Sequence, residues 1–225
     1  RVRSSAASDV YKRQMTYREM LNTLNADVWN NLTENEKLDY FQSLENYMAM
    51  ESNRESCKVN GRFLYTGEEG IVLGAYNPET REIDINVSQF DSYALYGQEP
   101  SRLTQTCLHE GRHALQHQVA EGMVDYLNQK TAEEWKHNLE EGNYISYKRN
   151  PKAYYQQPVE RDAREFAESR YAALLAEKEN MENSMGDSVD INEAAQVFAS
   201  QMENNSELSA DFQSVGNSEH VGQRM

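Results

Sequence analysis

The hydrophobic positions of the chain recur with a helical period in its first part. Residues 16–24 predict a short helix, and a second helix is predicted after Thr33, where apolar side chains recur at intervals of three and four residues. Thr33 and Glu36 form a capping-box pattern, in which the glutamate can bond back to the backbone of the capping threonine. We therefore expect the folded part of the chain to open with two helices.

The period changes between residues 71 and 87. Residues 71–76 form an apolar run, the sequence Asn-Pro-Glu-Thr at residues 77–80 is typical of a turn, and residues 82–87 alternate between polar and apolar side chains. This pattern predicts a β-hairpin with one face exposed to solvent.

Helical spacing returns in two longer segments. One helix is predicted from Ser101, as its N-cap, to about Glu121, and another from Pro158 to about Glu177. A tyrosine-rich connection joins them. The elements together predict an α+β fold that is mostly helical, with a small hairpin or sheet packed against the helix that follows Ser101.

The two ends of the chain differ from this core. Residues 1–14 show no period and resemble translated sequencing-adapter read-through, so we interpret them as a non-native tract before Met15 rather than as a short basic tail. Residues 177–225 contain few large apolar side chains and predict an acidic, largely disordered tail, in which residues 190–202 could form a short amphipathic helix. The predicted domain is therefore 15–176.

The charge of the chain limits its partners. It has 225 residues with 22 Lys and Arg against 37 Asp and Glu, a net charge of −15. Such an acidic protein is not expected to bind nucleic acid or an anionic membrane surface. No run of 18 apolar residues predicts a transmembrane helix, and Cys57 and Cys107 are too few for a disulfide framework. These features favour a cytoplasmic protein, and they leave the oligomeric state open.

The strongest chemical signal is the motif H-E-x-x-H at residues 109–113. His109 and His113 lie one turn apart on one helical face, separated by a rise of about 6 Å, so both imidazoles can reach one ion. Zn²⁺ prefers such nitrogen ligands in a tetrahedral site that keeps one position for water. Glu110 lies beside the pair and could take a proton from a zinc-bound water.

The third ligand must come from another part of the chain. His117 lies eight residues from His109, about 12 Å along a straight helix, which is too far for one zinc ion. Glu160 shares a helical face with Ala163 and Ala167, whose small side chains would let this helix approach the motif closely. Glu160 is therefore the predicted ligand. The alternatives are that Glu160 is an exposed acid near a helix N-terminus, and that Asp162 supports a ligand imidazole from the second layer.

Residues 108–116 (LHEGRHALQ), followed by residues 158–167 (PVERDAREFA), resemble a minimal gluzincin, a zincin-like zinc metallopeptidase similar to small H-E-x-x-H proteins of bacterial phages and mobile elements. The resemblance covers residues 60–175. It implies that His109, His113 and Glu160 bind one Zn²⁺ ion and that Glu110 is the catalytic base. It departs from the common pattern at Arg164, where these families usually carry an aspartate.

The resulting expectation is zinc-dependent hydrolysis of a protein or peptide substrate. The hairpin resembles the peptide-binding edge of zincins, and its second strand, residues 82–87, could pair with the substrate backbone. Oxyanion stabilisation could come from His137 or a tyrosine, with the adjacent pair Tyr154 and Tyr155 ranked above Tyr147.

Two alternatives remain at this point. The chain could be a catalytically silent zincin-like interaction protein that binds a partner through its acidic surface and tail, although the intact Glu110 speaks against it. It could also be a helical protein in which the motif arose by chance.

Overall fold

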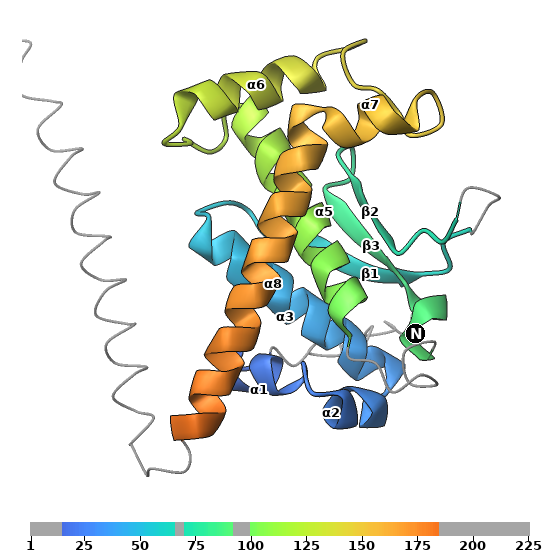
Figure 1. Cartoon of the computed structure of the whole chain (residues 1–225), viewed down its shortest axis with the longest axis vertical. Coiled ribbons are helices and arrows are strands. Elements are labelled where there is room, and N and C mark those ends of the chain that lie inside the picture. Colours follow the sequence, from blue (N-terminus) through green and yellow to red (C-terminus); the bar gives the residue numbers. More distant parts are fainter. Residues whose placement is uncertain (1–14, 66–69, 92–99, 185–225) are drawn as a thin grey trace, which may run out of the picture. The chain divides into compact units, whose positions relative to one another are not determined.

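The structure is a computed structural model that describes residues 15–65, 70–91 and 100–184 (Figure 1). The chain divides into two units, residues 1–178 and 179–225, and only residues 179–184 of the second unit are described. The predictions for residues 1–14 and for the tail beyond Ser184, including the helix at 190–202, lie outside the described residues. None of the described helices combines the length and the apolar surface that crossing a bilayer requires.

The predicted α+β fold class is confirmed, because helices dominate the described residues and a small mixed sheet accompanies them. In chain order the elements are α1 (Tyr17–Asn22), α2 (Ala26–Asn31), α3 (Glu34–Glu51), β1 (Lys58–Arg62), β2 (Gly74–Asn77), β3 (Glu82–Asn86), the 3₁₀ helix η1 (Val87–Gln89), α5 (Ser101–Ala120), α6 (Gln129–Leu139), α7 (Pro151–Gln156) and α8 (Pro158–Ser184).

The sheet has the strand order β1-β3-β2, with β3 parallel to β1 and antiparallel to β2. The predicted hairpin is therefore present as β2 and β3, although β2 begins at Gly74 rather than at Ile71. Its turn is stabilised by Asn77, whose Oδ1 accepts from the backbone N–H groups of Glu79 and Thr80. Since β3 is the central strand, β2 forms one edge of the sheet.

Local capping signals identify most helix starts. The capping box of Thr33 and Glu36 forms as predicted, and a second box forms between Thr16 and Glu19. The start of α5 is displaced by one residue from the prediction, because Pro100 holds the N-cap position and Ser101 is the first helical residue.

Five elements were missing from the sequence prediction: α2, β1, η1, α6 and α7. β1 contains one buried apolar side chain, Val59, and α6 buries only Trp135 and Asn138, so neither shows a clear period. α7 has a good N-cap in Asn150 but buries none of its six residues. Short, mostly polar elements of this kind are held by their neighbours and carry a weak hydrophobic pattern.

Helix α5 packs against α3, the sheet and α6 (Figure 1). Aromatic residues fill the core next to its first turn. Trp29 and Phe41 are fully buried and meet edge to face, and Tyr40 joins α3 to α5 through a 3.0 Å hydrogen bond between its Oη and Thr104 Oγ1. This packing places the helix with the histidine motif at the centre of the domain.

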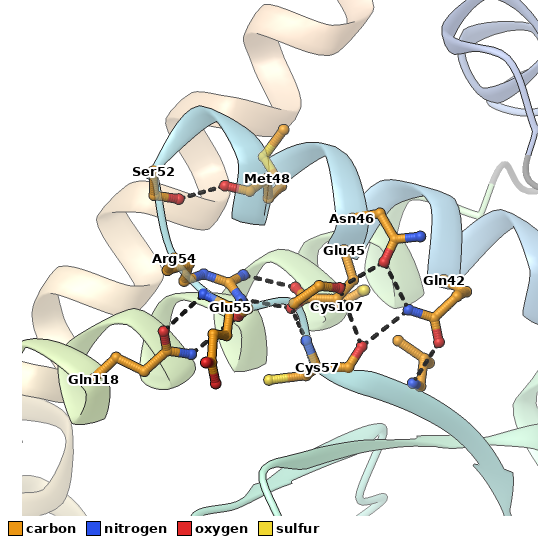
Figure 2. A network of polar contacts seen from close by, with 12 residues as sticks. Gln42, Glu45, Asn46, Met48, Ser52, Arg54, Glu55, Cys57, Cys107 and Gln118 are labelled. Carbon is orange, nitrogen blue, oxygen red and sulfur yellow. Dashed lines mark hydrogen bonds and ion pairs between the residues drawn. The ribbon is translucent and has the colours of Figure 1, made fainter. Parts of the chain in front are cut away.

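A buried polar network holds the segment between α3 and β1 against α5 (Figure 2). Glu45 and Arg54 form a two-pronged ion pair with distances of 2.6 and 2.7 Å, and Glu45 Oε1 also accepts from the backbone N–H of Cys57 at 2.8 Å. On α5, the Gln118 side chain accepts from the backbone N–H of Glu55 and donates to its carbonyl. Because every oxygen of the buried carboxylate has a donor, the network can be desolvated without leaving an unpaired charge.

Candidate metal centre

The three predicted ligands lie together between α5 and α8. The Nε2 atoms of His109 and His113 are 3.0 Å apart, and they lie 3.4 and 3.5 Å from the two carboxylate oxygens of Glu160. Donors around a tetrahedral ion with bonds of about 2.0–2.1 Å lie roughly 3.3 Å from one another. The separations therefore match the edges of a metal tetrahedron, and this group could hold a metal ion.

The approach of α8 to α5 depends on small and apolar residues. Ala163 and Ala167 are buried, as the spacing around Glu160 suggested, and Val159 is fully buried. The Gln116 side chain of α5 donates to the carbonyl of Val159 at 3.0 Å, which fixes the start of α8 beside the motif. Glu160 consequently points inward and is not the exposed acid of the alternative interpretation.

The Glu160 carboxylate is unusual in its surroundings. It is 1% exposed, its Oε1 accepts a 2.8 Å hydrogen bond from the Tyr144 hydroxyl, and its Oε2 has no hydrogen-bond partner among the described residues. Burial raises the pKa of Glu160, but the neighbouring imidazoles of His109 and His113 outweigh burial and hold this pKa well below its usual range. A buried carboxylate oxygen without a partner is costly, and a cation held with the imidazoles would satisfy it.

Gln116 determines which nitrogen of His113 is free. Its amide nitrogen donates to Val159 and Asp162, so its Oε1, 2.7 Å from His113 Nδ1, must accept a hydrogen bond from the Nδ1–H of that ring. The Nε2 atom of the neutral His113 is then unprotonated and faces the group, as a metal ligand requires.

Asp162 acts through Gln116 and does not contact a ligand imidazole, which corrects the direct contact considered from the sequence. Its carboxylate accepts from Arg112 at 2.8 and 3.1 Å and from Gln116 at 2.8 Å. The guanidinium of Arg112 also lies over the rings of Tyr126, Trp135 and Phe166. The side chain that orients His113 is therefore anchored to a largely buried, charged and aromatic cluster.

Glu110 lies outside the ligand group, at the edge strand. Its Oε2 accepts a 2.8 Å hydrogen bond from the backbone N–H of Tyr76 in β2. Glu110 and His109 line a cleft of about 280 Å³ between α5, α8 and the start of β2. Its remaining lining residues are Leu73, Arg102, Gln105, Thr106, Arg164, Ala167 and Glu168.

The prediction that residues 82–87 pair with a substrate is wrong, because β3 already has a strand on each side. Within the described sheet, β2 is the strand that lies at an edge and next to Glu110. The β2–β3 register explains the geometry: Leu73 pairs with Asn86 through a hydrogen bond, so the N–H of Tyr76 points away from β3.

The other predicted histidines and tyrosines are divided between the site and the surface. His117 is not part of the ligand group, and its ring packs against Tyr76 with centroids 5.5 Å apart. His137 is exposed and contacts Glu140. The ring of Tyr154 packs edge-on against that of Tyr144, and burial and the Glu160 charge raise the pKa of the Tyr154 hydroxyl. The ring of Tyr155 lies against Arg164.

Tyr144 is the site residue that sequence reasoning missed. Its hydroxyl contacts Glu160, and its ring packs edge-on against Tyr154. The only signal in the sequence was the richness in tyrosine of the segment before α8, which does not single out one residue.

The fold and the site define a mostly helical α+β protein with a His-His-carboxylate group that could hold a metal ion. Comparisons of the chain with protein-family models, with curated proteins and with solved structures found no match. Its function is therefore inferred from the chemistry of the site.

Proposed function

We propose that the chain is a zinc-dependent peptidase that hydrolyses a peptide bond in a protein or peptide substrate. The observation that carries the proposal is the convergence of His109, His113 and Glu160 within 4.8 Å of one another beside a cleft that also contains Glu110. Two imidazoles and one carboxylate are a donor set that suits Zn²⁺ and leaves one coordination position open.

Zinc held by these three residues would polarise the scissile carbonyl and lower the pKa of a coordinated water. Glu110 is the general base in this scheme: it accepts the proton of the attacking water and delivers it to the leaving amine. The backbone N–H of Tyr76 supports this role, because it holds one carboxylate oxygen at 2.8 Å and leaves the other oxygen free to move a proton.

The edge of β2 supports the choice of an extended peptide as substrate. Gly74 directs both of its backbone groups, and Tyr76 its carbonyl, away from β3, where a further strand could pair with them, while the N–H of Tyr76 remains bonded to Glu110. A peptide bound at this edge would pass close to Glu110, because the N–H of Tyr76 already reaches that carboxylate.

The metal site is tested by the zinc content of the full chain. We expect about one zinc per wild-type chain and a loss of zinc in His113→Ala and Glu160→Ala, while His117→Ala keeps it because His117 lies on the same helix but outside the group. Absence of zinc from wild type after reconstitution would contradict the proposal.

The chemistry is tested by cleavage of an unstructured protein or a peptide library. Glu110→Gln should retain zinc and lose cleavage by a factor of about 10²–10⁴, since it removes the base without removing a ligand. Unchanged biological function of this variant would favour the catalytically silent interaction protein.

A further inference from the structure

One arginine of the cleft lacks the partner that comparable arginines have. Arg164 is half-buried on α8, and the Nη1 atom of its guanidinium is buried without a hydrogen-bond partner among the described residues. The other described arginines that are not exposed all pair with a carboxylate. They are Arg54, Arg81, Arg112 and Arg170.

The guanidinium of Arg164 is held in place from one side. Its Nη2 donates to the backbone carbonyl of Tyr155, and its Cζ lies 5.1 Å from the centre of the Tyr155 ring. Glu168, one turn further along α8, lines the same cleft but makes no ion pair with Arg164 in the described structure. A positioned, partly desolvated cation without a counter-charge is costly, and a carboxylate is the group that a guanidinium binds best.

The position of Arg164 relates it to the proposed reaction. It lies four residues after Glu160, so its backbone is about 6 Å further along the same helical face. Arg164 also lines the cleft together with His109 and Glu110. A group bound at Arg164 would thus be separated from the metal ligands by roughly the length of two extended amino-acid residues, at about 3.3–3.6 Å each.

We propose that Arg164 binds a carboxylate of the substrate, so that the cleft selects peptides with a negative charge about one to two residues from the scissile bond. This inference rests on the proposed function. The carboxylate is either the C-terminus of the substrate or the side chain of an aspartate or glutamate. Arg164 is a binding residue in this proposal and does not take part in the proton transfers assigned to Glu110.

The experiment measures the affinity of the zinc-loaded full chain for four thiol probes by isothermal titration calorimetry. The thiol of each probe is a zinc ligand. 3-Sulfanylpropanoyl-glycine carries a terminal carboxylate, and its amide does not. The third probe is 3-sulfanylpropanoyl-aspartic acid α-amide, whose C-terminus is amidated and whose side-chain carboxylate is free. The fourth is the matched asparagine α-amide, which has no carboxylate.

In wild type, at least one of the two acids should bind about tenfold or more tightly than its matched amide, which is the gain typical of a charge-assisted pair. The pair that shows the gain identifies the source of the carboxylate. Arg164→Gln should reduce the gain to less than about twofold while the amides bind as before. Arg161→Gln removes an exposed positive charge from the same helix and should keep the full gain.

The zinc content of the same samples distinguishes a failure of the proposed zinc site from a failure of the proposed role of Arg164. Equal affinity for acid and amide in a chain with one zinc would overturn the role of Arg164 and leave the metal site intact. An equal loss of acid and amide binding in Arg164→Gln would also overturn it. A wild-type chain without zinc would overturn the proposed function and this inference with it.

Discussion

Gly111, the third residue of the histidine motif, gives a sharp test of the packing around α5. A Cβ atom at this position would lie 2.8 Å from Glu45 Oε2 and 3.2 Å from Arg54 Nη2. These atoms cannot move aside freely, because Glu45 and Arg54 bind each other at 2.6 and 2.7 Å and both side chains are 1% exposed. Gly111→Ala must therefore strain the helix or loosen the buried pair.

Two opposing effects set the magnitude. Alanine is favoured over glycine in a helix by about 0.8–1.0 kcal/mol. Overpacking a buried site costs about 1–3 kcal/mol, and breaking a buried ion pair costs about 3–5 kcal/mol. Since the ion pair would loosen rather than break, and its buried atoms cannot move aside, we take the upper part of the overpacking range, about 2–3 kcal/mol. Subtracting the helical gain of about 1 kcal/mol, we expect Gly111→Ala to lower the free energy of unfolding by about 1–2 kcal/mol.

The assay is urea unfolding followed by circular dichroism, with Ala172→Gly as the control. Ala172 is exposed on α8, so its replacement measures the Ala–Gly difference of this protein without a packing effect. Gly111→Ala should keep its zinc, because Gly111 faces α3 whereas His109 and His113 face α8. A Gly111→Ala variant as stable as wild type, or more stable, would refute the reasoning.

Three further outcomes follow from the contacts of the site and core. Gln116→Leu should weaken zinc binding by about 10–100-fold in a chelator competition, because Nδ1 of His113 loses its acceptor. Tyr144→Phe should weaken it less, by about tenfold or under, since Glu160 keeps its other contacts and loses one donor. Burial raises the pKa of the Cys57 thiol from its ordinary 9.0 to about 12. The unfolded chain therefore releases this proton at a lower pH than the folded chain, and stability should fall as the pH rises from 9 toward 12. Urea midpoints at pH 8 and 10 measure that decline, which should be smaller in Cys57→Ala.

The sequence predicted the parts of the site that depend on local spacing. The motif fixes His109 and His113 on one face of a helix whatever surrounds it, and the capping and small-residue patterns located α3 and the inward face of α8. Glu160 could be predicted because Ala163 and Ala167 repeat at the spacing of its own face, and both are buried where α8 meets α5.

The sequence could not predict the parts that depend on which segments meet in space. Tyr144 lies in a segment without hydrophobic period, and its contact with Glu160 exists only because the chain between α6 and α7 passes over the start of α8. The central position of β3 in the sheet could not be predicted either, because it depends on pairing with β1. That strand has one buried apolar residue and therefore no clear hydrophobic pattern. Sheet order is a tertiary property that the alternation of a single hairpin does not determine.

Because β2 rather than β3 is the edge strand next to α5, the position of the Glu110 carboxylate depends on the backbone of β2. With β2 at the edge, the carboxylate is held by a backbone N–H of the strand that a substrate would join, so its position depends on the strand and not on the identity of a neighbouring side chain. Gly74 allows this closeness, because a Cβ there would lie 2.7 Å from the Thr106 side chain on α5. Glu110, the histidine pair and the edge strand β2 are thus fixed to one another through α5, whose opposite face is held by the buried Glu45–Arg54 pair. A rigid helix that carries the candidate ligands on one face and structural contacts on the other is the arrangement that the proposed catalysis requires.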